Sequence, residues 1–161
     1  MERCDLAVER KHQLGCNCCQ AVLLAFAPEI ARRWCGDGKK SGEGGVAGMF
    51  QKDGLEDGLM ALGSGFGAGM GGMDATCGAL VGAGMVVGLL NGNGAASDGG
   101  ESRPAVPVVL KTRRLCAEFK EKVGALRCAD IKGVQTKKVL CSCDNCVRYA
   151  VQIAEKYIDP E

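Results

Sequence analysis

The sequence predicts an all-α fold, a small single-domain helical bundle whose helices are joined by glycine-rich loops. No segment alternates apolar and polar residues over the length of a strand, and the apolar residues recur instead at helical spacings. The chain has 161 residues, which suits one domain, and its hydrophobic content of 47% is ordinary for a globular protein with a packed core. We therefore expect residues 1–161 to form one domain.

The first helices are predicted from apolar spacing and from one proline. Ala7, Leu14 and Cys18 share one helical face, with a weak point at Gly15, and the apolar run continues to residue 27. A proline follows at position 28, where it favours the first position of a new helical turn that a glycine at position 36 would end. The sequence thus predicts that a new helical turn begins at Pro28.

A polar, glycine-rich stretch precedes the next helix, and residues 36–54 are predicted to be a flexible loop. Asp53 and Glu56 form a capping-box pattern at its end. The apolar stripe predicted for the helix that follows consists of Leu55, Leu59, Leu62 and Phe66. Residues 63–72 are so rich in glycine that we expect irregular structure there.

A helix from Cys77 to about Leu90 is predicted next, with Asp74 or Thr76 as its cap. It contains four glycines, each of which costs about 1 kcal/mol relative to alanine in a helix interior. One helical face is expected to hold Cys77, Val81, Gly84 and Gly88. This spacing predicts that a neighbouring backbone approaches closely just beyond Cys77.

The last third of the chain predicts a loop and two further helices. Residues 91–107 are expected to be a long flexible connection. The helix predicted from Val108 to Val123 would place Glu118 and Lys122 as an exposed ion pair, and its apolar stripe consists of Val108, Leu115, Phe119 and Val123. The final helix is expected to start near Asp144 or Asn145, and its wide apolar face consists of Cys146, Val147, Ala150, Val151, Ile153, Ala154, Tyr157 and Ile158.

The formal net charge of +1 gives no reason to expect nucleic acid or a membrane surface as a partner. The charged N-terminus leads into no apolar run, so no secretory signal is predicted, and the longest apolar stretch is too short for a convincing membrane span. We expect a cytoplasmic protein. The small residues of the helix after Cys77 could pack within one chain or across a homodimer.

Eleven cysteines are the most informative feature of the chain. A reducing cytoplasm disfavours structural disulfides, so this many thiols indicate metal, iron–sulfur or thiol-redox chemistry. Cys77 and Cys146 lie near predicted helix starts, where the helix dipole stabilises thiolates. Cys16 and Cys19 form a CxxC pair, as do Cys143 and Cys146, but about 120 residues separate the pairs, unlike a compact zinc finger.

Other site types are less well supported. A thioredoxin-like site would need a βαβ pattern, and haem c attachment would need a histidine after one of the CxxC pairs. The one histidine, His12, is expected at the surface. Residues 67–72 match GxGxxG, but no strand precedes them, so a nucleotide site is rejected in favour of close backbone approach. No catalytic constellation is identified.

Four motifs together resemble the C-GCAxxG-C-C family of redox-active proteins. Residues 15–23 (GCNCCQAVL) resemble its opening, and residues 65–71 with 77–82 (CGALVG) resemble its GMG turn and its CGAxxG motif. Residues 126–133 (LRCADIKG) and 146–149 (CVRY) resemble its third and fourth cysteine motifs. The resemblance runs in order from about residue 6 to residue 158.

The resemblance implies a small helical protein of the kind found mainly in anaerobic prokaryotes, with four key cysteines, Cys18, Cys77, Cys128 and Cys146. It also implies an iron–sulfur cluster of undetermined type on these four residues, electron transfer or redox sensing, and a redox partner protein. Cys16, Cys19, Cys141 and Cys143 are candidate substitute ligands, whereas Cys4, Cys35 and Cys116 match no motif. Two alternatives stay open: a metal-free thiol–disulfide protein, and a zinc-binding structural module. An oxidoreductase accessory or electron carrier fits the pattern without a defined catalytic reaction.

Overall fold

The computed structural model describes residues 1–35, 54–92 and 106–158, and in these residues the regular structure is helical, as the sequence predicts. The N-terminal part contains α1 (Arg3–Leu14), α2 (Cys18–Ala25), α3 (Ala27–Cys35), α5 (Leu55–Gly63) and the 3-10 turn η2 (Ser64–Phe66). The rest contains α6 (Gly78–Asn91), α7 (Val106–Val123), α8 (Cys128–Lys132) and α9 (Cys143–Lys156). None of the described helices is both long and apolar enough to cross a membrane.

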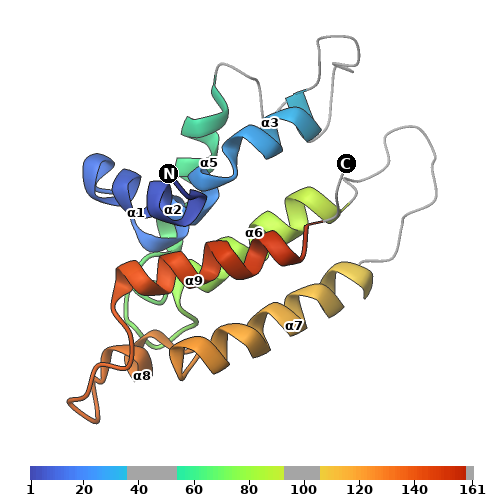
Figure 1. The fold of residues 1–161 in the computed structure, drawn as a ribbon. Helices are drawn as coiled ribbons and strands as arrows, with labels where there is room; N and C mark the ends of the chain where they lie inside the picture. Colours follow the sequence, from blue (N-terminus) through green and yellow to red (C-terminus); the bar gives the residue numbers. More distant parts are fainter. Residues whose placement is uncertain (36–53, 93–105, 159–161) are drawn as a thin grey trace.

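Helices α6, α7 and α9 run side by side and form the long layer of the fold (Figure 1). Helix α2 packs on α6, and α1 packs on α9 and α2, so α2 lies at the centre of the core. The largest fully buried side chains are Phe26, Phe119, Leu23, Leu24, Ile30, Leu59, Leu115, Ile131, Val22, Val86, Val87 and Val147. The predicted stripes of the helices now named α7 and α9 are confirmed as core-facing.

Helices α1 and α2 are separated by a left-handed residue at the predicted weak point. Gly15 caps α1 at a φ of 63°, a conformation that glycine adopts without strain. Leu14 consequently leaves the predicted face and is 57% exposed. Asn17 then begins α2 with a full capping box, in which its side chain accepts from the Gln20 amide and the Gln20 side chain accepts from the Asn17 amide.

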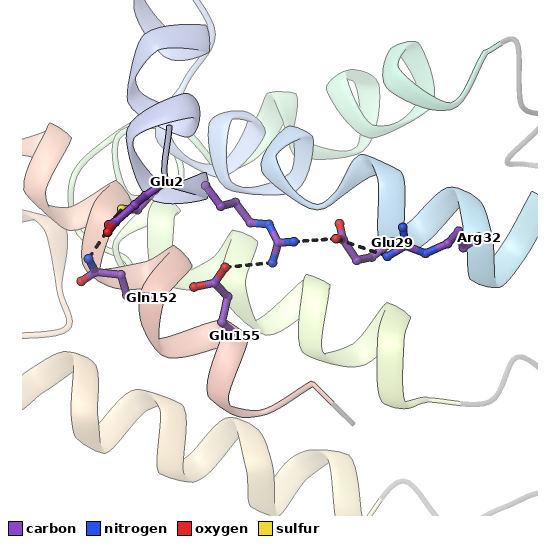
Figure 2. Close-up of polar contacts among 7 residues, drawn as sticks. Glu2, Glu29, Arg32, Gln152 and Glu155 are labelled. Carbon is purple, nitrogen blue, oxygen red and sulfur yellow. Dashed lines mark hydrogen bonds and ion pairs between the residues drawn. The ribbon is translucent and has the colours of Figure 1, made fainter. Parts of the chain in front are cut away.

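The start of α1 is tied to α3 and α9 by one arginine. The Arg3 guanidinium reaches Glu29 at 2.5 Å and Glu155 at 2.9 Å, and it lies 4.6 Å above the Phe26 ring centre. Figure 2 shows Glu29 and Glu155 reaching this side chain from two different helices, with Arg32 on the far side of Glu29. These contacts join three helices whose sequence positions are far apart.

Several local predictions differ from the structure. Leu62 is 41% exposed, because α5 packs through Leu55, Leu59 and Gly63 instead. The chain also changes to a 3-10 turn before Phe66. Glu118 does not pair with Lys122 but binds Lys156 at 2.7 Å and accepts a hydrogen bond from the Tyr157 hydroxyl, both supplied by α9. Helix α9 starts slightly earlier than predicted, because Ser142 accepts from the Asn145 amide as its cap.

The N-terminus of α6 also differs from the prediction. Neither Asp74 nor Thr76 caps it; Cys77 itself occupies the N-cap position. The predicted loops at 36–54 and 91–107, and the predicted Asp53 cap, lie wholly or largely outside the described residues. The five-residue α8 was not predicted at all.

Close packing of α6 against α2 occurs on a different face from the one predicted. A Cβ added at Gly78 would lie 2.4 Å from the Phe66 carbonyl oxygen, and one at Gly82 would lie 2.8 Å from the Cys19 carbonyl oxygen. At Gly84 the nearest atom is an ordinary 3.7 Å away, and at Gly88 nothing lies within 4 Å. The close backbone approach is therefore at Gly78 and Gly82, on a different face of α6 from Gly84 and Gly88.

Two substitutions in α6 test this packing. We expect Gly82→Ala to lower the free energy of unfolding by about 1–3 kcal/mol, because α2 must move to admit the methyl group. We expect Gly88→Ala to raise it by about 0.5–1 kcal/mol, because alanine favours a helix interior and the methyl group meets open space. Urea denaturation of both variants measures the difference, and effects of the same sign would contradict the observed packing.

Candidate functional site

Five cysteines line one cavity of about 220 Å³. They are Cys18, Cys77, Cys128, Cys143 and Cys146, and they share the cavity wall with Lys11, Asn17, Ala68, Met73, Gly78, Ile131 and Lys132. The structure therefore brings together the four cysteines of the sequence motifs, which lie up to 128 residues apart in the sequence. Cys143, considered only as a substitute ligand, lines the cavity beside them.

Each of these cysteines lies at the N-terminal end of a helix. Cys18, Cys128 and Cys143 are the first residues of α2, α8 and α9, Cys77 is the N-cap of α6, and Cys146 is in the first turn of α9. Helix N-termini carry partial positive charge and unpaired N–H groups, which stabilise anions. The ends of α6, α8 and α9 meet in the lower left part of Figure 1. The fold thus directs four helix ends at one cavity.

A short antiparallel pairing places Cys77 beside Cys128. The Cys77 amide donates to the Leu126 carbonyl at 2.8 Å, and the Cys128 amide donates to the Ala75 carbonyl at 2.9 Å. Between them Thr76 and Arg127 form an isolated bridge. This pairing is too short to leave a strand pattern in the sequence, and it connects the start of α6 to the start of α8.

A left-handed turn covers the cavity on the side of residues 67–73. Ala68, Gly69, Met70, Gly71 and Met73 all have positive φ, between 48° and 88°. Non-glycine residues adopt this region at a cost of about 1–3 kcal/mol each, and such strain is concentrated at functional sites. A Cβ added at Gly69 would lie only 2.6 Å from the Cys128 Cβ. The irregular structure predicted for this segment is confirmed, and its backbone packs closely on the Cys128 side chain.

Asn17 joins this turn to α2. Its side-chain amide donates to the carbonyls of Gly63 and Ser64, at 3.1 Å each, while its oxygen caps α2. A Cβ added at Gly67 would lie 2.8 Å from the Asn17 Cβ, so the turn also packs directly on this residue. Cys18 is therefore held at the cavity by the capping residue that precedes it.

The cavity thiols form two hydrogen-bonded pairs. A hydrogen bond from the Cys18 thiol lowers the pKa of Cys143 to about 5, and the Lys132 ammonium adds to this effect. A hydrogen bond from the Cys146 thiol lowers the pKa of Cys77 to about 7, assisted by the amides of Ala79 and Leu80. Sharing a proton in this way raises the pKa of Cys18 and of Cys146. Each pair therefore combines a thiolate with a neutral thiol.

The remaining cysteines lie outside the cavity wall. Cys141 neighbours Cys146 from the loop before α9, and its proximity contributes to the raised pKa of Cys146. Cys16 and Cys19 are buried elsewhere: the Cys16 thiol faces the Arg10 carbonyl, and the Cys19 thiol lies 4.0 Å from the Met85 sulfur. Burial raises the pKa of Cys19 to about 12. The Cys16–Cys19 pair is thus not directed at the cavity, although both residues were candidate substitutes.

His12 lies at the surface, as predicted, with a side chain 61% exposed. It nevertheless contributes indirectly to the site, because it and Lys11 bind the two carboxylate oxygens of Asp144 at 2.9 and 2.8 Å. Asp144 follows Cys143 in the first turn of α9. These contacts fasten the Cys143 end of α9 to α1.

A second group of potential ligand atoms lies at the start of α1. Glu2, Cys4 and Asp5 each offer one atom within 4.8 Å of the others. Asp5 already binds Arg148 at 3.0 Å, and the Cys4 sulfur accepts from Gln152 at 3.5 Å. The Cys4 thiol also faces the Glu2 carboxylate at 3.6 Å, and Figure 2 shows Glu2 close to Gln152. Existing partners therefore account for this group.

The family comparison agrees with the cavity. The model of the family described as "Putative redox-active protein (C_GCAxxG_C_C)" matches residues 16–157. The chain belongs to this family. The family match includes all five cavity cysteines and Lys132, but not Lys11, Cys4 or the Glu2–Asp5 group. No curated protein and no solved structure matches the chain.

The reactivity of Cys143 tests the charge distribution in the cavity. With a pKa of about 5, this thiol is mostly thiolate at pH 6, where an ordinary cysteine is mostly protonated. We expect iodoacetamide to modify Cys143 first in metal-free protein at pH 6, as measured by mass spectrometry. Lys132→Met should move the pH midpoint of this reaction upward, because the thiolate loses its cation, whereas Lys138→Met should not. A midpoint near that of a free cysteine in the unchanged protein would contradict the assignment.

Proposed function

We propose that this redox-active protein binds an iron–sulfur cluster in the five-cysteine cavity and uses it for electron transfer or redox sensing. The observation that carries the proposal is the convergence of five thiols, at the N-terminal ends of four helices, on one cavity. Cysteine thiolates are the usual ligands of such clusters, and a bound cluster supplies one-electron chemistry. Cys18, Cys77, Cys128 and Cys146 are the proposed ligands.

The size of the site favours a cluster over a single metal ion. The cavity of about 220 Å³ is several times the roughly 30 Å³ that one water molecule occupies in the liquid. Four thiolates around one zinc ion lie about 3.8 Å apart, given a Zn–S bond of about 2.3 Å and tetrahedral geometry. In the described part of the chain, no three cysteine sulfurs lie within 4.8 Å of one another. This spacing supports a group whose ligands bind different metal atoms.

The electrostatics also suit an anionic group. Four helix N-termini point at the cavity, and Lys11 and Lys132 stand in its wall. Cys77, Cys128 and Cys146 are at most 8% exposed, so their sulfurs are largely shielded from water. Hydrogen bonds, net charge and solvent exposure set the potential of a thiolate-bound cluster. The two lysines are therefore expected to make reduction easier.

A second candidate function rests on the two thiol pairs. Cys18 with Cys143, and Cys77 with Cys146, each combine a thiol and a thiolate in contact. Oxidation of such a pair forms an S–S bond and releases two electrons and the proton of the neutral thiol, all of which a partner disulfide accepts as it is reduced to a thiol and a thiolate. In that case the protein would exchange disulfides with a partner and need no metal.

A reductive titration separates these functions. Protein purified without oxygen is titrated with dithionite while its visible spectrum and its free thiols are recorded. A cluster function gives reversible bleaching with no change in thiol number. A dithiol function gives no colour, and two thiols appear per disulfide at a defined potential. The second outcome would replace the cluster proposal.

A further inference from the structure

An exposed segment protrudes beside the cysteine cavity. Residues 134–140, which follow α8, are all exposed, and Figure 1 shows this loop extending beyond α8. Three large apolar side chains lie in it: Val134 is 44% exposed, Val139 is 59% exposed and Leu140 is 47% exposed. The Leu140 amide donates to the Ile131 carbonyl at 2.9 Å, which fixes the end of the loop on α8.

A groove of about 550 Å³ lies next to this loop and is separated from the cysteine cavity by α8. Arg127, Ala129 and Asp130 line the groove, whereas Cys128, Ile131 and Lys132 line the cavity. Lys120 and Leu140 also line the groove. One face of α8 therefore borders the groove and another borders the cysteine cavity. In the sequence, Cys128 lies between Arg127 and Ala129, which both line the groove.

The region around the groove is basic. Residues 120–140 contain six basic and two acidic residues, a net charge of +4, in a chain whose net charge is +1. Asp130 is already paired with Arg127 at 2.8 Å. Lys120, Lys137 and Lys138 are exposed and form no ion pair with other described residues. Positive charge is therefore left unbalanced around the exposed apolar side chains of the loop.

We propose that this surface, formed by Val134, Val139, Leu140, Lys120, Lys137 and Lys138, docks a redox partner protein that presents an acidic surface. The inference rests on the proposed function and names its partner class. Complementary charge steers such encounters and raises their rate, while a small apolar centre holds the partner briefly. A partner seated here is separated from the cavity only by α8, which carries Cys128.

Other macromolecules fit this surface less well. Single-stranded nucleic acid is bound by aromatic side chains as well as cations, and residues 120–140 contain no aromatic residue. An anionic membrane is bound by clusters of four to eight cations, roughly, on a continuous face. The proposed surface offers instead three lysines, only two of them adjacent in the sequence, and three apolar side chains.

The test uses an acidic [2Fe–2S] ferredoxin as the probe, with two matched charge-reversal variants. Lys137→Glu/Lys138→Glu changes the proposed surface, and Arg113→Glu/Arg114→Glu makes the same change in net charge on the exposed side of α7. Stopped-flow spectroscopy measures electron transfer from the reduced ferredoxin. We expect the first variant to be about tenfold slower or more at low salt and the second to be little affected. The difference should vanish at about 1 M salt, where charges are screened.

A third variant and a second readout keep the result unambiguous. Val139→Ser should weaken binding at all salt concentrations, since it removes apolar surface without changing charge. Dithionite reduction should be equal in all variants, which shows that the cofactor is intact. If dithionite reduced no cofactor in the unchanged protein, that result would count against the proposed function and not against the docking surface. Calorimetry with oxidised ferredoxin measures docking whether or not electrons move.

Two outcomes would overturn the docking proposal. In the first, both double variants lose ferredoxin binding equally, or neither does, so the effect does not belong to this surface. In the second, ferredoxin does not bind the unchanged protein, but phosphatidylserine vesicles or single-stranded DNA do, and Lys137→Glu/Lys138→Glu abolishes that binding. The surface would then belong to a membrane or nucleic-acid site.

Discussion

Cys77→Ala is expected to yield protein with little or no iron and no visible colour, together with a large loss of stability. Cys77 is 6% exposed, borders the cavity and lies at the junction of α6 with the loop that leads to α8. Removing this ligand would release one of the four segments that the proposed cluster joins. We expect a destabilisation of about 4 kcal/mol or more, a size typical of a lost metal site. Iron analysis and thermal denaturation measure both effects.

Cys116→Ala is the matched control for this experiment. Cys116 is half-buried on α7, outside the cavity wall, and burial alone raises its pKa. Its replacement should leave iron content and colour unchanged and should cost little stability. A Cys77→Ala protein that keeps its full iron content and colour would show that Cys77 is not a ligand, and the proposed ligand set would be abandoned.

Gly69→Ala is expected to disrupt the site without removing any sulfur. The new methyl group would lie 2.6 Å from the Cys128 Cβ and 2.9 Å from the Ala75 carbonyl oxygen, and the residue has a φ of +57°. Cys128 and the turn cannot both keep their places. We expect reduced iron content and a destabilisation of about 3 kcal/mol, combining backbone strain with overpacking. Metal analysis and urea denaturation are the measurements.

Gly71→Ala separates strain from steric displacement. Gly71 has a φ of +88°, but no atom lies within 4 Å of the Cβ that alanine would add. This variant should therefore be destabilised by backbone strain, about 1–2 kcal/mol, and still bind iron. If Gly71→Ala lost iron as completely as Gly69→Ala, the contact between Gly69 and Cys128 would not explain the effect.

Much of the fold follows from helical spacing in the sequence. The apolar stripe of α7 needs only the recurrence of Leu115, Phe119 and Val123, all of which are buried. The short helix α8 has five residues, fewer than two turns, so it leaves no periodic pattern. The glycines of α6 show a different limit: their spacing indicates a close approach, but only the rotation of α6 against α2 selects Gly78 and Gly82.

The site could be predicted in part. The four motif cysteines follow from the family resemblance, and the structure places all four on one cavity wall. Cys143 could be named only as a substitute, because its role depends on contacts with Cys18 and Lys132 that come from other helices. Neither Lys11 nor Lys132 carries any local signal of a site. Their significance arises where α1 and α8 meet the start of α9, which spacing along the chain does not reveal.

The central claim is that the five-cysteine cavity holds an iron–sulfur cluster. The most direct test is the content of iron and acid-labile sulfide per chain, together with zinc, in protein purified without oxygen. The account requires iron and sulfide in nearly equal amounts and a broad visible absorption. Folded, colourless protein without iron or sulfide would contradict it, and the zinc content of that sample would then distinguish a zinc module from a thiol–disulfide protein.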